Sequence, residues 1–236
     1  RKEVVIFAQG IGPLNRVISK LIVKSLLKHA KFVSVRDEKS QALLADWRIN
    51  AKLVNDPVFS ISIQEIPKNF ALGVQLREFS TMNEAFLVSL AEFLLKDFPN
   101  RKIELFVFQK ALDERVCKRF SEIIKSKNPK VDVELIYYEN RAEIFKRIAQ
   151  LDYMFAMRFH AVIAAIKAGV KTVAIDYDVK VQRLAEEASI PLISLKAEEN
   201  NFDAVFDSIK SLSPARLSDF ASSKQFDWSQ IETLFL

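Results

Sequence analysis

Short apolar runs alternate with amphipathic runs along most of this 236-residue chain. Apolar runs of about four to eight residues that end at turn residues predict buried strands, and apolar residues at helical spacing predict the helices that cover them. In the first third of the chain, the pattern predicts strands at 3–9, 32–36 and 51–54 and a helix over 15–30. Asp37 directly follows the second strand, where its side chain is expected to cap another helix.

The alternation becomes more regular after residue 70. The expected strands cover 70–77, 102–109, 131–138, 153–159, 171–177 and 190–195. Thr81 and Glu84 have the spacing of a capping box, and Asn140 with Glu143 is expected to open a later helix. Gly169 is expected to turn the chain from a helix into the next strand. After about residue 200 the pattern predicts helices, with a break at the sequence SLSPAR.

Strands that alternate with helices form parallel βαβ units and a doubly wound α/β sheet. A connection near residues 57–70 divides the chain into a Rossmann-like domain over 1–66 and a second one over 67–200, followed by C-terminal helices over 201–236. The first part holds only three expected strands, and the chain begins at Arg1 rather than methionine. We therefore expect the first domain to be incomplete at its N-terminus.

The composition narrows the class of protein. Half of the residues are hydrophobic, as in an ordinary globular domain, and no apolar run reaches the ~18–20 residues of a membrane-spanning helix. The formal net charge of +5 favours an anionic partner but is too small to indicate nucleic acid. Cys117 is the single cysteine, so the chain has no internal disulfide. This fits a reducing compartment, and Cys117 is expected to be a buried packing residue.

Several common site motifs do not occur in the sequence. The GIGP turn after the first strand lacks the G-x-G-x-x-G fingerprint of dinucleotide binding, and neither a P-loop nor G-x-S-x-G is present. His29 and His160 are far apart, and no cluster of histidine, cysteine or carboxylate residues has metal-ligand spacing. The sequence therefore predicts no metal ion, and His29 is expected at a helix C-terminus.

Polar residues, most of them cationic, recur where the expected strands end. In an open α/β sheet, ligands bind beyond the carboxyl ends of the strands. The residues at these ends are Gln9, Gly10, Arg36, Arg77, Arg158, His160 and Lys180, with Gly12 in the first turn. Each one alone would more often be a solvated edge charge, a helix cap or a surface residue. Together, cations at one rim repel one another without an anion between them, so the placement predicts a phosphate or carboxylate ligand.

His160 combines a strand end with a helix start. The N–H groups and the dipole of a helix N-terminus favour an anion and disfavour an imidazolium unless a bound anion restores it. A histidine beside a bound phosphate is suited to act as a general acid. Arg158 lies two residues earlier, so both side chains are expected on one side if the strand continues that far.

Four segments together resemble the polysaccharide pyruvyl transferases, a family that includes the cell-wall pyruvyl transferase of Gram-positive surface-layer anchoring. They are AQGIGPL, VSVRDEKSQALL, NDP and MRFHAVIAAIKAGVKTVAIDYDVK, and the resemblance runs from about residue 5 to about residue 190. It implies a fold like that of GT-B glycosyltransferases, with two Rossmann-like domains facing a cleft. The chain departs from the family at its N-terminus, where members normally carry further βα units and a Gly-rich segment on the acceptor side.

The resemblance implies transfer of pyruvate from phosphoenolpyruvate (PEP) to two hydroxyls of a sugar as a ketal, with no metal or tightly bound cofactor. The family's PEP-binding arginine matches Arg36 in SVRD, its histidine matches His160 in MRFH, and its lysine matches Lys180 in YDVK. Arg36 and Lys180 would hold the phosphate and the carboxylate with help from Arg158, and His160 would be the general acid. Arg77 and the Gln9–Gly12 turn complete the expected substrate-binding set.

The acceptor is expected to be a cell-surface glycan or its lipid-linked precursor. A lipid-linked acceptor would bring a cytoplasmic enzyme to the inner face of the membrane, as a peripheral protein. Two other interpretations fit the same residues. A GT-B glycosyltransferase would use these cations for a nucleotide sugar, and a non-catalytic truncated relative would bind an anionic glycan or a partner. The helices over 201–236 would cross back onto the first domain or pack on a partner chain, which leaves the oligomeric state open.

Overall fold

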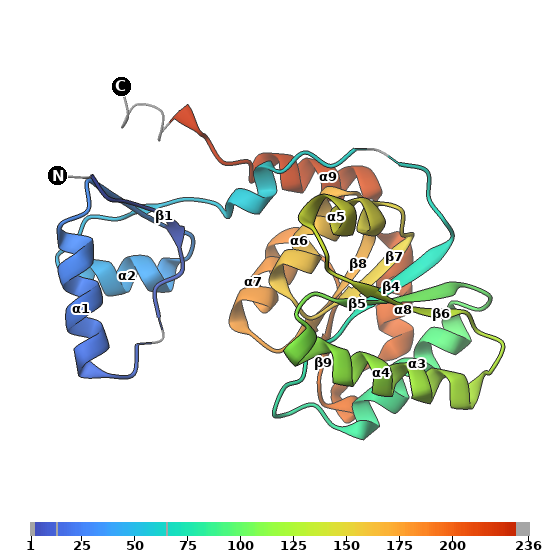
Figure 1. Ribbon diagram of the computed structural model, residues 1–236. Helices are drawn as coiled ribbons and strands as arrows, with labels where there is room; N and C mark the ends of the chain where they lie inside the picture. The colour runs from blue at the N-terminus through green and yellow to red at the C-terminus, as the bar shows by residue number, and fades with distance from the viewer. Residues whose placement is uncertain (1–2, 13, 65, 230–236) are drawn as a thin grey trace. The chain divides into compact units, whose positions relative to one another are not determined.

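The computed structural model describes residues 3–12, 14–64 and 66–229. The chain divides into two compact units (Figure 1). The first comprises the described residues of Arg1–Ile61 together with those from Ser223 onward, and the second comprises Ser62–Ser222. Within the described residues, no helix is both long and apolar enough to cross a bilayer.

The first unit contains a three-stranded parallel sheet in the order β1-β2-β3. Its elements are β1 (Val5–Gln9), α1 (Val17–Lys28), β2 (Phe32–Val35), α2 (Glu38–Asp46), β3 (Lys52–Leu53) and a 3-10 turn at Pro57–Ser60. The three expected strands are confirmed, although the third is shorter than predicted. Asp37 caps α2 as expected, because its side chain accepts a hydrogen bond from the Ser40 N–H at 2.8 Å.

The chain returns to the first unit after residue 223. The Phe226 N–H donates to the Ser60 hydroxyl at 2.8 Å. The rings of Phe226 and Trp228 lie 4.7 and 5.5 Å, between centroids, from the ring of Phe7 in β1. These aromatic contacts attach the end of the described chain to its beginning.

The second unit is a six-stranded parallel sheet with the strand order β6-β5-β4-β7-β8-β9. The strands are β4 (Ala71–Gln75), β5 (Lys102–Val107), β6 (Val133–Tyr137), β7 (Tyr153–Ala156), β8 (Lys171–Asp176) and β9 (Leu192–Ser194). All six expected strands are confirmed. Counted within the unit, the order is 3-2-1-4-5-6, that of a dinucleotide-binding doubly wound fold. The chain reverses direction across the sheet between β4 and β7, which pair in parallel.

Helices cover this sheet (Figure 1). They are α3 (Glu84–Asp97), α4 (Lys110–Lys127), α5 (Arg141–Ala149), α6 (Phe159–Lys167), α7 (Val179–Ala188), α8 (Phe202–Ser211) and α9 (Pro214–Ser223), with a 3-10 turn at Ala197–Glu199. The predicted C-terminal block divides here, because α8 and nearly all of α9 belong to the second unit. Phe202 of α8 stacks on Phe93 of α3, with ring centroids 4.7 Å apart.

Local signals are confirmed at some helix ends and wrong at one. The Asn140 side chain caps α5 at the Glu143 N–H, and Gly169 follows α6 with a φ of +61°. The capping box at Thr81 is wrong, because Asn83 caps α3 through the Phe86 N–H at 2.9 Å. Asn83 directly precedes the first helical residue, and Asn is among the best N-cap residues.

Candidate functional site

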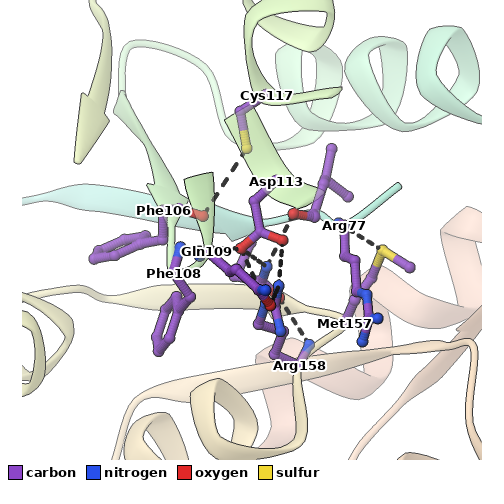
Figure 2. A network of polar contacts seen from close by, with 10 residues as sticks. Arg77, Phe106, Phe108, Gln109, Asp113, Cys117, Met157 and Arg158 are labelled. Atoms are coloured by element: carbon purple, nitrogen blue, oxygen red, sulfur yellow. Dashed lines mark hydrogen bonds and ion pairs between the residues drawn. The ribbon is translucent and has the colours of Figure 1, made fainter. Parts of the chain in front are cut away.

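The switch point between β4 and β7 is where this fold class binds ligands, beyond the carboxyl ends of the strands. The loops that leave the two strands are joined here (Figure 2). The Met157 N–H donates to the Gln75 carbonyl at 3.0 Å, and the Arg77 N–H lies 3.2 Å from the Met157 sulfur. Arg77 and Arg158 are therefore held on two adjoining loops.

Arg158 forms a buried ion pair with Asp113 of α4 (Figure 2). Its Nε and Nη2 donate to the two Asp113 carboxylate oxygens at 2.9 and 2.5 Å. Asp113 is fully buried and also accepts the backbone N–H groups of Phe108 and Gln109. The Arg158 N–H donates to the side chain of Gln75 at 2.7 Å, and only 17% of the arginine side chain is exposed. The positive charge of Arg158 is thus balanced inside the protein.

Arg77 has a different environment on the neighbouring loop. Its Nε is buried and has no hydrogen-bond partner among the described residues. Its guanidinium carbon lies 5.7 Å from the ring centroid of Tyr177, which follows β8, and Phe79 packs edge-on against the same ring. Buried donors in native proteins are nearly always paired with protein, ordered water or a ligand, so the Arg77 Nε is available to an acceptor from outside the described residues.

His160 lies in the first turn of α6 and is exposed. The strand does not continue to Arg158 and His160, so the condition for expecting both side chains on one side of it is not met. The strand β7 ends at Ala156, and Arg158 is the N-cap residue of the helix. The strand β7 thus ends three residues before residue 159, the end that the apolar pattern predicts, although the Met157 N–H still donates to the Gln75 carbonyl. His160 keeps its predicted place at a helix N-terminus.

Lys180 occupies the corresponding place on the next helix. It is half-buried in the first turn of α7, after β8, and its N–H donates to the capping side chain of Asp178 at 2.8 Å. The strands β4, β7 and β8 are consecutive neighbours in the sheet. Their carboxyl ends lead to Arg77, His160 and Lys180, so the structure brings these three predicted residues to one edge of the second unit.

The remaining predicted residues lie in the first unit. The Arg36 N–H donates to the Gln9 carbonyl at 3.3 Å, and its Nη1 pairs with Asp56 at 2.6 Å. Gly10 and Gly12 belong to the following turn, where Gly12 has a φ of +108° that favours glycine. The Arg36 Nε is buried without a hydrogen-bond partner among the described residues, as in Arg77. These groups lie together at the carboxyl edge of the three-stranded sheet.

Two carboxylates that pair with predicted site arginines are not among the residues predicted from the sequence. Asp56 appears in the sequence only within the NDP segment of the family resemblance, and Asp113 carries no local signal that separates it from an ordinary acid in a first helical turn. Both are buried, and each pairs with an arginine that follows a strand. Among the described residues, no group of three histidine, cysteine or carboxylate side chains is placed to hold a metal ion.

The chain matches the family model described as polysaccharide pyruvyl transferase over residues 1–179. A comparison with curated proteins gave no match.

Solved structures share the fold. UDP-GlcNAc 2-epimerase from Neisseria meningitidis bound to UDP-GlcNAc has 12% identity and a TM-score of 0.64, covering 99% of this chain and 70% of that one. Anabaena Alr3699/HepE in complex with UDP and glucose has 16% identity and a TM-score of 0.62, with the same coverages. TarM from S. aureus has 15% identity and a TM-score of 0.57, covering 98% of this chain.

The chain spans about half the length of TarM and of the pneumococcal O-GlcNAc transferase GtfA, since it covers 49% and 46% of those chains. At these identities the likeness concerns the fold. It shows that this chain, with its two parallel sheets, has the α/β architecture of GT-B glycosyltransferases and related epimerases, as expected from the sequence.

Proposed function

Because the chain belongs to the polysaccharide pyruvyl transferase family, we propose that it transfers pyruvate from PEP to two hydroxyls of a sugar. The bond between the enol oxygen and C2 of PEP breaks, and two new C–O bonds at C2 form the cyclic ketal. One hydroxyl proton is needed for the methylene carbon, which becomes a methyl group, and the other leaves with inorganic phosphate or solvent. The acceptor is a cell-surface glycan or its lipid-linked precursor.

The observation that carries this proposal is the buried Nε of Arg77, which has no hydrogen-bond partner among the described residues and lies at the sheet edge from which α6 and α7 begin. PEP has a phosphate and a carboxylate, so it needs several donors at one edge. Arg77, His160 and Lys180 follow three neighbouring strands, and the first turns of α6 and α7 add N–H groups that favour anions. Arg158 has a different role, because its ion pair with Asp113 shapes the loop that leads into α6.

In the proposed reaction, His160 protonates the methylene carbon of PEP, and positive charge develops at C2. A sugar hydroxyl attacks C2, phosphate leaves, and the second hydroxyl closes the ketal. Lys180 and Arg77 stabilise the charge on the leaving phosphate and on the carboxylate, as preorganised donors do in other phosphate-releasing sites. The family resemblance also gives Arg36 a role in PEP binding. The buried Nε of Arg36 supports an acceptor group there, and Arg36 is tested separately because it lies in the first unit.

A second candidate function is glycosyl transfer from a nucleotide sugar. It is favoured by solved structures of similar fold that contain UDP, among them TarM, HepE and the pneumococcal GtfA. The same cations would then bind a diphosphate. This candidate predicts affinity for UDP and none for PEP.

Thermal unfolding of the chain with PEP, with UDP and with neither ligand tests both candidates. A ligand that binds only the folded state stabilises it by about 2.7 kcal/mol at a hundredfold excess over its Kd. We expect PEP to raise the unfolding temperature of the wild type, and both Arg77→Ala and Arg36→Ala to lose this increase. Arg216→Ala removes an exposed arginine of the second unit and should keep it.

An increase with UDP alone would favour the glycosyltransferase, and no increase with either ligand would favour a non-catalytic relative. If PEP binds, release of phosphate that depends on an added sugar acceptor tests the transfer itself.

A further inference from the structure

The helix α1 is apolar on its exposed face as well as on its core-facing side. Val23 and Leu27 face the core of the first unit. The opposite face is apolar as well: Val17, Ile18, Leu21, Ile22 and Leu26 are 55–72% exposed. A surface helix of a globular protein normally places polar residues on the face away from the core. Five large apolar side chains exposed in consecutive turns indicate an interaction surface.

The charges around this face all have one sign. Lys20, Lys24 and Lys28 follow one another at intervals of four residues, so they form a row along one side of the apolar face. Residues 4–36 contain six lysines and arginines and no aspartate or glutamate. The rest of the chain then has 29 basic and 30 acidic residues, so this segment holds the whole positive excess.

A basic hollow adjoins the C-terminal end of α1. It has a volume of about 590 Å3, and its lining includes Lys28, Lys31, Arg48 and Lys52 but no acidic residue. Lys31 also pairs with Glu3 at 2.8 Å. Four cations around a hollow of this size suit a phosphate-bearing headgroup, and they continue the positive surface of the helix.

We propose that α1 is an interfacial helix that docks the protein on an anionic lipid membrane. Its exposed apolar residues would enter the boundary between headgroups and acyl chains, and the lysine row with the basic hollow would contact the negative headgroups. Interfacial helices combine these features, an apolar face and a lysine-rich polar flank, whatever their length. The inference rests on α1 and its charges, so it stands or fails independently of the reaction proposed above.

Co-sedimentation of the full chain with vesicles tests the proposal. We expect binding to phosphatidylcholine vesicles that contain phosphatidylglycerol, weak binding to phosphatidylcholine alone, and release at high salt, which screens the lysines. In K20Q/K24Q/K28Q the partition coefficient should fall by up to about a hundredfold, because each lysine near an anionic surface contributes about fivefold. The matched control K110Q/K125Q/K130Q removes three exposed lysines of the second unit and should bind like the wild type.

The apolar face is tested with L21Q/I22Q. This variant should lose at least about tenfold in binding to the same vesicles while its unfolding temperature stays unchanged, because both side chains are exposed. A clear fall in the unfolding temperature would mean that other parts of the chain cover this face, and it would overturn the proposal.

Two further outcomes would also overturn it. One is equal binding of the α1 lysine variant and its control to anionic vesicles. The other is a dimer in analytical ultracentrifugation that L21Q/I22Q abolishes, without vesicle binding by the wild type, which would assign the face to a second copy of this chain.

Discussion

Two arginines follow neighbouring strands of the six-stranded sheet, and their guanidinium groups have opposite environments. Arg158 donates two hydrogen bonds to a fully buried carboxylate, and its loop is tied to Gln75. Arg77 keeps a buried Nε without a partner among the described residues and lies near an aromatic ring. A cation at a strand end is therefore not by itself a ligand-binding residue. Pairing with a buried carboxylate decides whether the charge stabilises the fold or is available to a ligand.

Arg36 in the first unit combines both situations. Its Nη1 pairs with Asp56, and its Nε is buried without a partner among the described residues. One edge of the guanidinium is thus anchored by Asp56, and the Nε remains available to an acceptor from outside the described residues. Anchoring of this kind reduces the entropy that a long side chain loses when it binds a ligand.

The largest change in stability is expected from Asp113→Asn. It leaves the Arg158 guanidinium without its carboxylate at a mostly buried site, and breaking a buried pair in this way costs about 3–5 kcal/mol. Urea denaturation followed by circular dichroism measures the free energy of unfolding. Glu122→Gln changes an exposed carboxylate of the same helix and is the control, with an expected cost below about 1 kcal/mol. Equal costs would mean that Arg158 does not depend on Asp113.

His160→Ala should lower kcat and leave the Arg158–Asp113 ion pair intact, although His160 and Arg158 both lie at the start of the same helix. Loss of a general acid lowers kcat by about 10²-fold to 10⁴-fold. We expect at least a hundredfold fall in kcat, with PEP half-saturation and the free energy of unfolding nearly unchanged, in a phosphate-release assay. If PEP affinity collapses while kcat at saturation survives, His160 binds PEP and is not the general acid.

Arg77→Lys tests the buried Nε directly, which has no partner in the described part of the chain, because lysine keeps the charge and removes that N–H. A hydrogen bond to a charged group contributes about 1.5–3 kcal/mol, so PEP affinity should fall at least about tenfold. The free energy of unfolding should stay the same or rise slightly, since a buried unpaired donor is lost. Isothermal titration calorimetry and urea denaturation measure the two quantities. Unchanged PEP affinity would show that Arg77 acts only as a point charge.

The smallest effect concerns Cys117, one helical turn beyond Asp113. Burial raises the pKa of its thiol to about 12, with a smaller contribution from the Asp113 charge. The thiol of the unfolded chain ionises near pH 8.5, so rising pH stabilises the unfolded state and stability is lost up to about pH 12. Between pH 9 and pH 10 the wild type should lose about 1 kcal/mol more than Cys117→Ala. Parallel stability curves for the two proteins would contradict this.

Much of the architecture follows from local patterns. The period of apolar residues identifies all six strands of the second unit, and the residue before a helix identifies the caps Asp37 and Asn140. The strand order along the chain also follows from the pattern, so the common edge of Arg77, His160 and Lys180 is predictable once helices alternate with parallel strands, although β7 ends earlier than predicted. The prediction at Thr81 is wrong because two possible N-cap residues, Thr81 and Asn83, lie two residues apart. The spacing alone does not show which of them caps the helix.

The sequence by itself therefore determined the order of the elements, the two parallel sheets and the place of the cations along the chain. Only the tertiary structure decided which of those cations have a buried carboxylate. Asp113 is 45 residues from Arg158, and Asp56 is 20 residues from Arg36. The exposure of the apolar face of α1 is likewise decided by the tertiary structure. The physical reason is that hydrophobic period and capping act within about one turn, whereas ion pairing and burial depend on distances through space.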